Sequence, residues 1–142
     1  MSLIQQWTNK SNYLAKNILE EVQETIPITL PIPIAEVVKL YVPFTEIYST
    51  TDPEITQSIS ACATRDAKNG WLILLNGIEP VQRQRFSLAH ELGHISVMPN
   101  PSETVYCGKS NDWEERVCDN FAGKILVPDD MLLQFCANNP KP

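Results

Sequence analysis

Apolar residues in the first part of the chain recur at the spacing of one face of an α-helix. Between residues 3 and 26 they follow steps of mostly four or seven, with Gln, Asn, Lys and Glu on the other face, which predicts an amphipathic helix. Three prolines then predict an extended connector, and a second, shorter helix is predicted over residues 34–41. The two apolar stripes consist of Leu3, Trp7, Leu14, Ile18, Val22 and Ile26, and of Ile34, Val37, Val38 and Tyr41.

The pattern after residue 43 is typical of β-strands. Residues 44–49 are rich in β-branched and aromatic side chains, and residues 59–64 alternate small residues with polar ones. The pair Asn69-Gly70 is the signal of a tight hairpin turn, which Lys68 would open. Residues 71–75 form an unbroken apolar run, which predicts a strand buried on both faces.

Helical periodicity returns in the second half. Pro80 is expected to start a helix that runs to about Val97, and the Pro, Gly, Ser and Asn residues of 98–111 predict a loop. Asn111 followed by Glu114 resembles a capping box, so the next helix is expected to begin there. Its apolar stripe would consist of Trp113, Val117, Phe121 and Ile125. Residues 128–130 would open a last short helix that carries three apolar side chains into the core, namely Met131, Leu132 and Phe135.

These elements predict an α+β fold, in which a small, twisted, mostly antiparallel β-sheet packs against several helices. A length of 142 residues suits one domain spanning 1–142 with a single core. The composition, 43% hydrophobic and 20% charged, is that of a globular chain rather than a disordered one.

Charge and segment composition narrow the class of protein. The net charge of −6 disfavours direct binding to nucleic acid, because the only close basic cluster is Arg83 with Arg85. The N-terminus lacks a basic region followed by an apolar run, and the run 71–75 is far shorter than the ~20 residues of a membrane span. The four cysteines, Cys62, Cys107, Cys118 and Cys136, show no C-x-x-C spacing, so we expect free thiols in a reducing cytosol. Together these features predict a soluble cytoplasmic protein.

The chain's only two histidines both lie in the segment His90-Glu91-Leu92-Gly93-His94, which has the H-E-x-x-H pattern of zinc proteases. Residues four apart on a helix lie on one face, so both imidazoles can bind one metal ion. Glu91 is offset by one residue and can reach a water held by that metal. The pattern therefore predicts an active-site helix of the kind found in zinc peptidases.

Zinc needs a third protein ligand, and without a third histidine this has to be Asp, Glu or Cys. Glu115 and Asp119 are four apart on a predicted helix, so Glu115 can serve as the ligand while Asp119 orients one of the histidines from behind. Three alternatives remain open at this stage. Glu114 could take the place of Glu115, Cys118 could complete a His₂Cys site, and Cys107 lies in the predicted loop.

This geometry predicts a mechanism. Zinc lowers the pKa of a bound water to about 7, which makes a nucleophile available at neutral pH. Glu91 would take the proton from that water and pass it to the leaving amine. Tyr106 could assist the developing oxyanion. The same ligands would also accept Mn²⁺ or Fe²⁺.

The segment from Arg85 to His94, R-F-S-L-A-H-E-L-G-H, resembles the R-F-T-L-A-H-E-L-G-H block of the ImmA/IrrE family of metallopeptidases. The segment from Glu115 to Ala122, followed by I-L-V-P, is similar to that family's E-x-x-A-N-x-F-A and L-L-M-P motifs. A strand that ends at Asn76, shortly before the active-site helix, also matches. The resemblance extends from about residue 59 to residue 133.

The resemblance implies that His90, His94 and Glu115 bind the metal and that Glu91 is the general base. Cys118 and Asp119 stand where the family commonly has Ala and Asn, so the role of Asp119 does not follow from the resemblance. Gly123-Lys124 likewise replaces a usual Ala-Glu.

The known activity of the family implies a function. Its members act in the cytoplasm of prokaryotes, where they cleave or otherwise inactivate helix-turn-helix repressors of mobile elements or stress regulons. The chain is therefore expected to be a zinc endopeptidase whose partner is a DNA-binding repressor. Two alternatives are a binding module that keeps the peptidase fold and regulates its partner by contact, and a toxin or accessory subunit of a mobile-element defence system.

Overall fold

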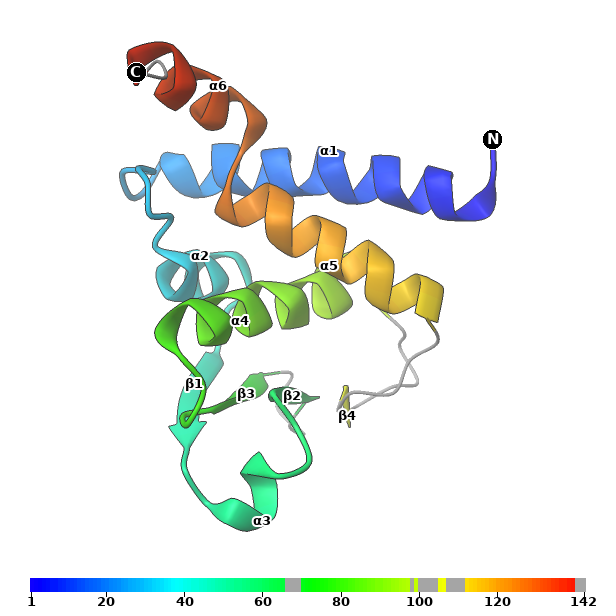
Figure 1. Ribbon diagram of the computed structural model, residues 1–142, viewed down its shortest axis with the longest axis vertical. Coiled ribbons are helices and arrows are strands. Elements are labelled where there is room, and N and C mark those ends of the chain that lie inside the picture. The colour runs from blue at the N-terminus through cyan, green and yellow to red at the C-terminus, as the bar shows by residue number, and fades with distance from the viewer. Residues whose placement is uncertain (66–69, 98, 100–104, 107–111, 140–142) are drawn as a thin grey trace.

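The computed structural model describes residues 1–65, 70–97, 99, 105–106 and 112–139, and it has an α+β architecture (Figure 1). The helices are α1 (Leu3–Gln23), α2 (Ile34–Tyr41), α3 (Pro53–Thr56), α4 (Val81–Ser96), α5 (Asp112–Leu126) and α6 (Asp129–Asn138). The strands are β1 (Thr45–Thr50), β2 (Ala61–Arg65), β3 (Trp71–Asn76) and β4 (Val105–Tyr106). The predicted fold class is confirmed.

The strands form one mixed sheet in the order β1-β3-β2-β4. Strand β1 runs parallel to β3, with Thr45 opposite Trp71, whereas β2 runs antiparallel to both β3 and β4. The antiparallel pair β2–β3, with Ala63 opposite Ile73, is the predicted hairpin. The turn residues Lys68 and Asn69 lie outside the described residues.

Helix α4 lies at the centre of the molecule, between the sheet and α5 (Figure 1). The sequence predicts a helix from Pro80 to about Val97, and these two residues flank the observed helix as its caps. Leu88, Ala89 and Leu92 are at most 3% exposed, because both sides of this helix are covered. Helix α1 packs on the far side of α5, so sheet, α4, α5 and α1 follow one another in layers.

Two of the burial predictions are wrong. Strand β3 is buried on one face only, since Trp71 and Ile73 face the helices while Leu72 points to the opposite side and is 40% exposed. Helix α6 begins where predicted, but Leu132 and Phe135 are exposed rather than in the core. This helix lies at the edge of the molecule, and only Met131 in its first turn packs against the core.

Three smaller findings concern single segments. The short helix α3 is not among the predicted elements, although Asp52 caps it by accepting a hydrogen bond from the Glu54 amide at 3.0 Å. Cys62 is disulfide-bonded, so the expectation of a free thiol is wrong for that residue, while Cys118 and Cys136 are free. Within the described part of the chain, no helix is both long enough and apolar enough to cross a membrane.

Candidate metal centre

Helix α4 presents both histidines on one face. The Nε2 atoms of His90 and His94 lie 3.2 Å apart, as the spacing of four residues on a helix allows. His94 is 5% exposed, and burial lowers the pKa of its imidazole below the ordinary value. The buried ring therefore favours its neutral form, which has a lone pair available for a metal.

Helix α5 brings two carboxylates to these imidazoles. Glu115 places Oε2 2.6 Å from His90 Nε2 and Oε1 3.2 Å from His94 Nε2. Asp119, one turn further along α5, places Oδ1 2.7 Å from Nδ1 of His90. The structure thus brings together four of the residues that the sequence singled out, with Glu115 between the two histidines and Asp119 behind one of them.

These distances allow a test of whether a metal would fit. Two ligands of one tetrahedral zinc, each bonded at about 2.0–2.1 Å, lie about 3.3 Å from each other. The separations of 3.2 Å between the histidine nitrogens, and between His94 and Glu115, match that value. The 2.6 Å contact of His90 with Glu115 is a hydrogen-bond length, and it would lengthen on binding. The donor set of two nitrogens and one carboxylate fits a divalent metal such as zinc.

A second set of donors overlaps with the first. His90, His94 and Cys118 offer ligand atoms within 4.8 Å of one another, which is close enough to bind a metal. The Cys118 side chain is fully buried, and this burial, followed by the charge of Glu115, raises the pKa of its thiol. The Glu115 carboxylate, in contrast, already touches both imidazoles. We therefore favour Glu115 as the third donor.

Glu91 lies in the wall of the same site and is 4% exposed. Burial, with a smaller effect from the charge of Glu115, raises the pKa of Glu91 to about 8. Its Oε2 atom is buried without a hydrogen-bond partner among the described residues. A carboxyl group in this state can exchange a proton near neutral pH with a molecule that enters the site.

The site opens into a cavity of about 390 Å³, which is large enough to hold part of a peptide. Its walls come from the segment leading into β2 and from α4 and α5. They are formed by Ser58, Ile59, Ser60, Ala61, Arg83, Phe86, Ser87, His90, Glu91, Glu115 and Asp119. The cavity is therefore acidic around the histidines, with one arginine further out along α4.

The remaining candidates from the sequence lie elsewhere. Glu114 is on α5 but does not line this cavity. The backbone of Tyr106 belongs to β4, while its side chain lies outside the described part of the chain, as do Cys107 and Asn111.

Gly93, which the sequence analysis did not single out, sets the distance between α4 and α5. A Cβ atom at this position would lie 3.2 Å from Phe121 Cδ1 and 3.3 Å from both Cα and Cβ of Cys118. A side chain here would require Phe121 or Cys118 to shift by a few tenths of an ångström, so the glycine lets α5 lie this close to α4. The glycine inside the H-E-x-x-H segment is the sequence feature that could have predicted this close approach of the two helices.

We expect Gly93→Val to push the two helices apart, at a cost of about 1–3 kcal/mol, and to weaken metal binding. Urea unfolding and a zinc titration would measure the two effects. The matched control is Gly123→Ala on α5, because a Cβ there meets nothing within 4 Å. That change should add about 0.5–1 kcal/mol of stability and leave the metal affinity unchanged. Equal zinc affinity in the Gly93→Val protein would contradict the spacing role of Gly93.

Comparison with known families gives one match. The model of the IrrE N-terminal-like domain, Peptidase_M78, matches residues 50–140, which include both α4 and α5. Helices α1 and α2 precede the matched region. No curated protein matches the chain.

Proposed function

The chain belongs to the IrrE N-terminal-like peptidase family, and from this we propose that it is a zinc-dependent endopeptidase acting on a specific protein substrate. The observation that carries the proposal is the convergence of the two α4 histidines and Glu115 beside the buried carboxyl of Glu91. In a catalytic zinc site three protein ligands leave one position for water or substrate.

In this proposal His90, His94 and Glu115 hold the metal. Asp119 accepts the Nδ1–H of His90, which fixes the tautomer that turns the Nε2 lone pair toward the metal. When bound, zinc acts as a Lewis acid and lowers the pKa of water to about 7, and Mn²⁺ or Fe²⁺ would supply similar chemistry.

Glu91 is the proposed general base. It accepts a proton from the attacking water and donates it to the amide nitrogen as the C–N bond breaks, so that a carboxylic acid and an amine leave the site. Its carboxyl is buried and lines the cavity beside the histidines. Assistance to the oxyanion by Tyr106 stays a prediction.

The proposed substrate is a helix-turn-helix repressor of a mobile element or stress regulon, met in the cytoplasm. The family resemblance supports this choice. The net charge of −6 supports it too, since an acidic protein is repelled by DNA and would meet the regulator rather than its operator.

The direct test is to incubate the zinc-loaded protein with the repressor encoded beside its gene. We expect one new N-terminus in the repressor by mass spectrometry, and no cleavage after a chelator removes the metal. An intact repressor that nevertheless loses its operator binding would contradict a peptidase and favour regulation by contact.

The role of Asp119 gives a separate prediction. Asp119→Ala should weaken zinc binding by about 10–100-fold, the usual loss when a carboxylate behind a histidine ligand is removed. Competition with a chromogenic chelator would measure the affinity. Asp129→Ala is the control, because Asp129 is an exposed carboxylate that pairs with Lys124 and has the same charge. If both variants bind zinc equally well, Asp119 does not orient His90.

A further inference from the structure

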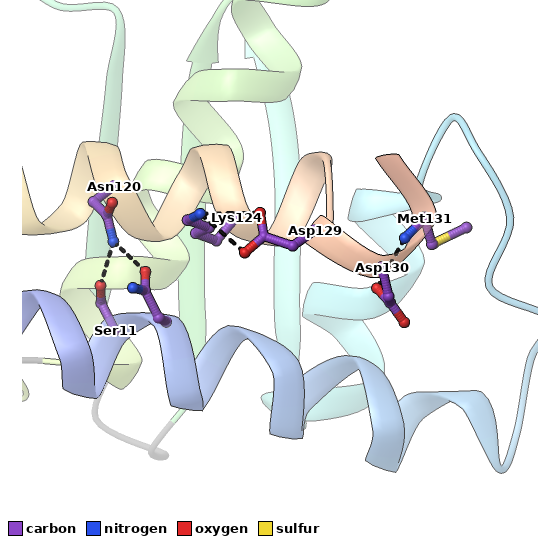
Figure 2. Close-up of polar contacts among 7 residues, drawn as sticks. Ser11, Asn120, Lys124, Asp129, Asp130 and Met131 are labelled. Atoms are coloured by element: carbon purple, nitrogen blue, oxygen red, sulfur yellow. Dashed lines mark hydrogen bonds and ion pairs between the residues drawn. The ribbon is translucent and has the colours of Figure 1, made fainter. Parts of the chain in front are cut away.

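A polar contact joins α1 to α5 over a large separation in sequence (Figure 2). The Asn120 amide donates one hydrogen bond to Ser11 Oγ at 2.7 Å and another to Asn12 Oδ1 at 2.6 Å. Ser11 is fully buried, and its hydroxyl donates to the carbonyl of Thr8 at 2.8 Å. We call Ser11, Asn12 and Asn120 the α1–α5 joint.

Asn120 lies on the same helix as the two acidic residues of the metal site, but on another face. Successive residues of an α-helix are about 100° apart, so Asn120 projects about 100° from Asp119 and about 140° from Glu115. Figure 1 shows the matching arrangement of the helices, with α5 between α1 and α4. One side of α5 is thus tied to α1 while the other side faces the histidines.

A second contact lies near the start of α5. The rings of Trp7 and Trp113 are 6.2 Å apart and tilted by 45°, which places an aromatic pair two positions before Glu115. Such apolar contacts bring the helices together but specify their rotation less sharply than paired polar groups do, because the hydrophobic effect has no direction. Hydrogen bonds in a buried site do have direction, and an unpaired Ser11 or Asn120 group would be costly there.

Small rotations of α5 matter for the metal site. A side-chain atom about 6 Å from the helix axis moves by about 1 Å when the helix turns by 10°. Metal–ligand distances tolerate only about 0.2 Å. A device that fixes the rotation of α5 would therefore decide whether Glu115 meets both histidines.

We propose that the α1–α5 joint is the positioning element of the metal site, acting on Glu115 and Asp119 through the rotation of α5. The inference rests on the proposed function, since it takes Glu115 to be a metal ligand. Helix α1 precedes the region matched by the family, so the match assigns it no role. Asn120, Ser11 and Asn12 are positioning residues, as none of them lines the cavity.

The test compares zinc affinity in Asn120→Ala with that in Ile18→Val. Both changes affect buried contacts of α1 and should lower the melting temperature, but the second removes only one buried methylene group. At a temperature well below both midpoints, we expect Asn120→Ala to bind zinc about 10–100-fold more weakly than the unmodified chain. Ile18→Val should stay within about twofold of it. Equal zinc affinity in the two variants would make the joint a stability element only and overturn the inference.

Two further measurements separate positioning from stability. Asn120→Asp keeps the shape of the side chain. It can accept from a turned Asn12 amide, and from Ser11 once that hydroxyl turns away from the Thr8 carbonyl, so it should recover part of the lost affinity. In the metal-free protein, the imidazole proton shared by His90 and Asp119 should give a downfield-shifted NMR signal that Asn120→Ala loses and Ile18→Val keeps. A signal that persists in Asn120→Ala would also overturn the inference.

Zinc binding by the unmodified chain separates a failure of the positioning role from a failure of the proposed function. If the unmodified chain binds no zinc, the proposed function fails first. If it binds zinc and Asn120→Ala binds equally well, only the positioning role fails. Should Asn120→Ala not fold, Ser11→Ala takes its place in the same comparison, because it removes one acceptor and leaves the bond to Asn12.

Discussion

Replacing Glu91 with Gln is expected to lower the rate of peptide-bond cleavage by about 10²–10⁴-fold while one zinc per chain stays bound. Gln has the shape of Glu but cannot accept the proton of the attacking water. Neither Glu91 oxygen belongs to the proposed ligand set, so the metal affinity should change little. Cleavage kinetics on a repressor fragment and elemental analysis of the purified protein would measure the two effects. Undiminished cleavage in this variant would show that Glu91 is not the base.

The same substitution should change the pH dependence of stability in the metal-free protein. The pKa of Glu91 is about 8 in the folded chain against an ordinary value of 4.5, so the unfolded chain loses this proton first as the pH rises. Stability therefore falls between about pH 4.5 and pH 8, and Glu91→Gln should remove this part of the fall. The melting temperature of the Glu91→Gln variant should therefore rise relative to that of the unmodified chain across this range. The lowered pKa of His94 has the opposite effect on stability, but it is common to both proteins. Parallel curves would contradict a protonated, buried Glu91.

The second large effect concerns Glu115, the proposed third ligand. Glu115→Ala is expected to weaken zinc binding by more than about 100-fold, beyond the loss typical of an outer carboxylate. Cys118→Ala should leave the affinity within a few-fold of the unmodified chain, because the Glu115 carboxylate is already in contact with both histidines. Chelator competition on both variants would decide between a carboxylate and a thiol.

The reverse result, with zinc lost in Cys118→Ala and kept in Glu115→Ala, would assign a His₂Cys site. The two variants differ in stability for separate reasons, since Cys118 is fully buried and Glu115 is not. Zinc affinity should therefore be compared well below both unfolding midpoints. Under these conditions a loss of zinc binding reflects the removal of a metal ligand rather than unfolding of the protein.

The features that could be predicted from the sequence are the local ones. The sequence predicts a helix over residues 34–41, observed as α2 (Ile34–Tyr41), because its apolar spacing and Pro33 are all near one another in the chain. The four-residue spacing of His90 and His94 on a helix is equally local, and so is that of Glu115 and Asp119. Residues four apart on a helix share one face, so they point to the same neighbouring element whatever that element is.

The features that were missed depend on where distant elements lie. The apolar side chains Leu72 and Phe135 carry no local sign that the helices cover one face of the sheet, or that α6 lies at the edge. The close approach of Gly93 to α5 and the bond between Ser11 and Asn120 also need the assembled fold to be visible. Sequence patterns locate the groups of this site, whereas tertiary packing sets the distances between them.

The long sequence separation of Ser11 and Asn120 means that α1 is synthesised well before the helix to which it is bonded. The two residues are 109 positions apart, so a ribosome adding about 5–20 residues per second makes α5 roughly 5–20 s after the start of α1. Until then α1 has no α5 to pack on, and its apolar stripe depends on earlier neighbours such as α2. Both histidines leave the ribosome before Glu115. A chain assembled in this order has no complete candidate metal site while most of it is still being made.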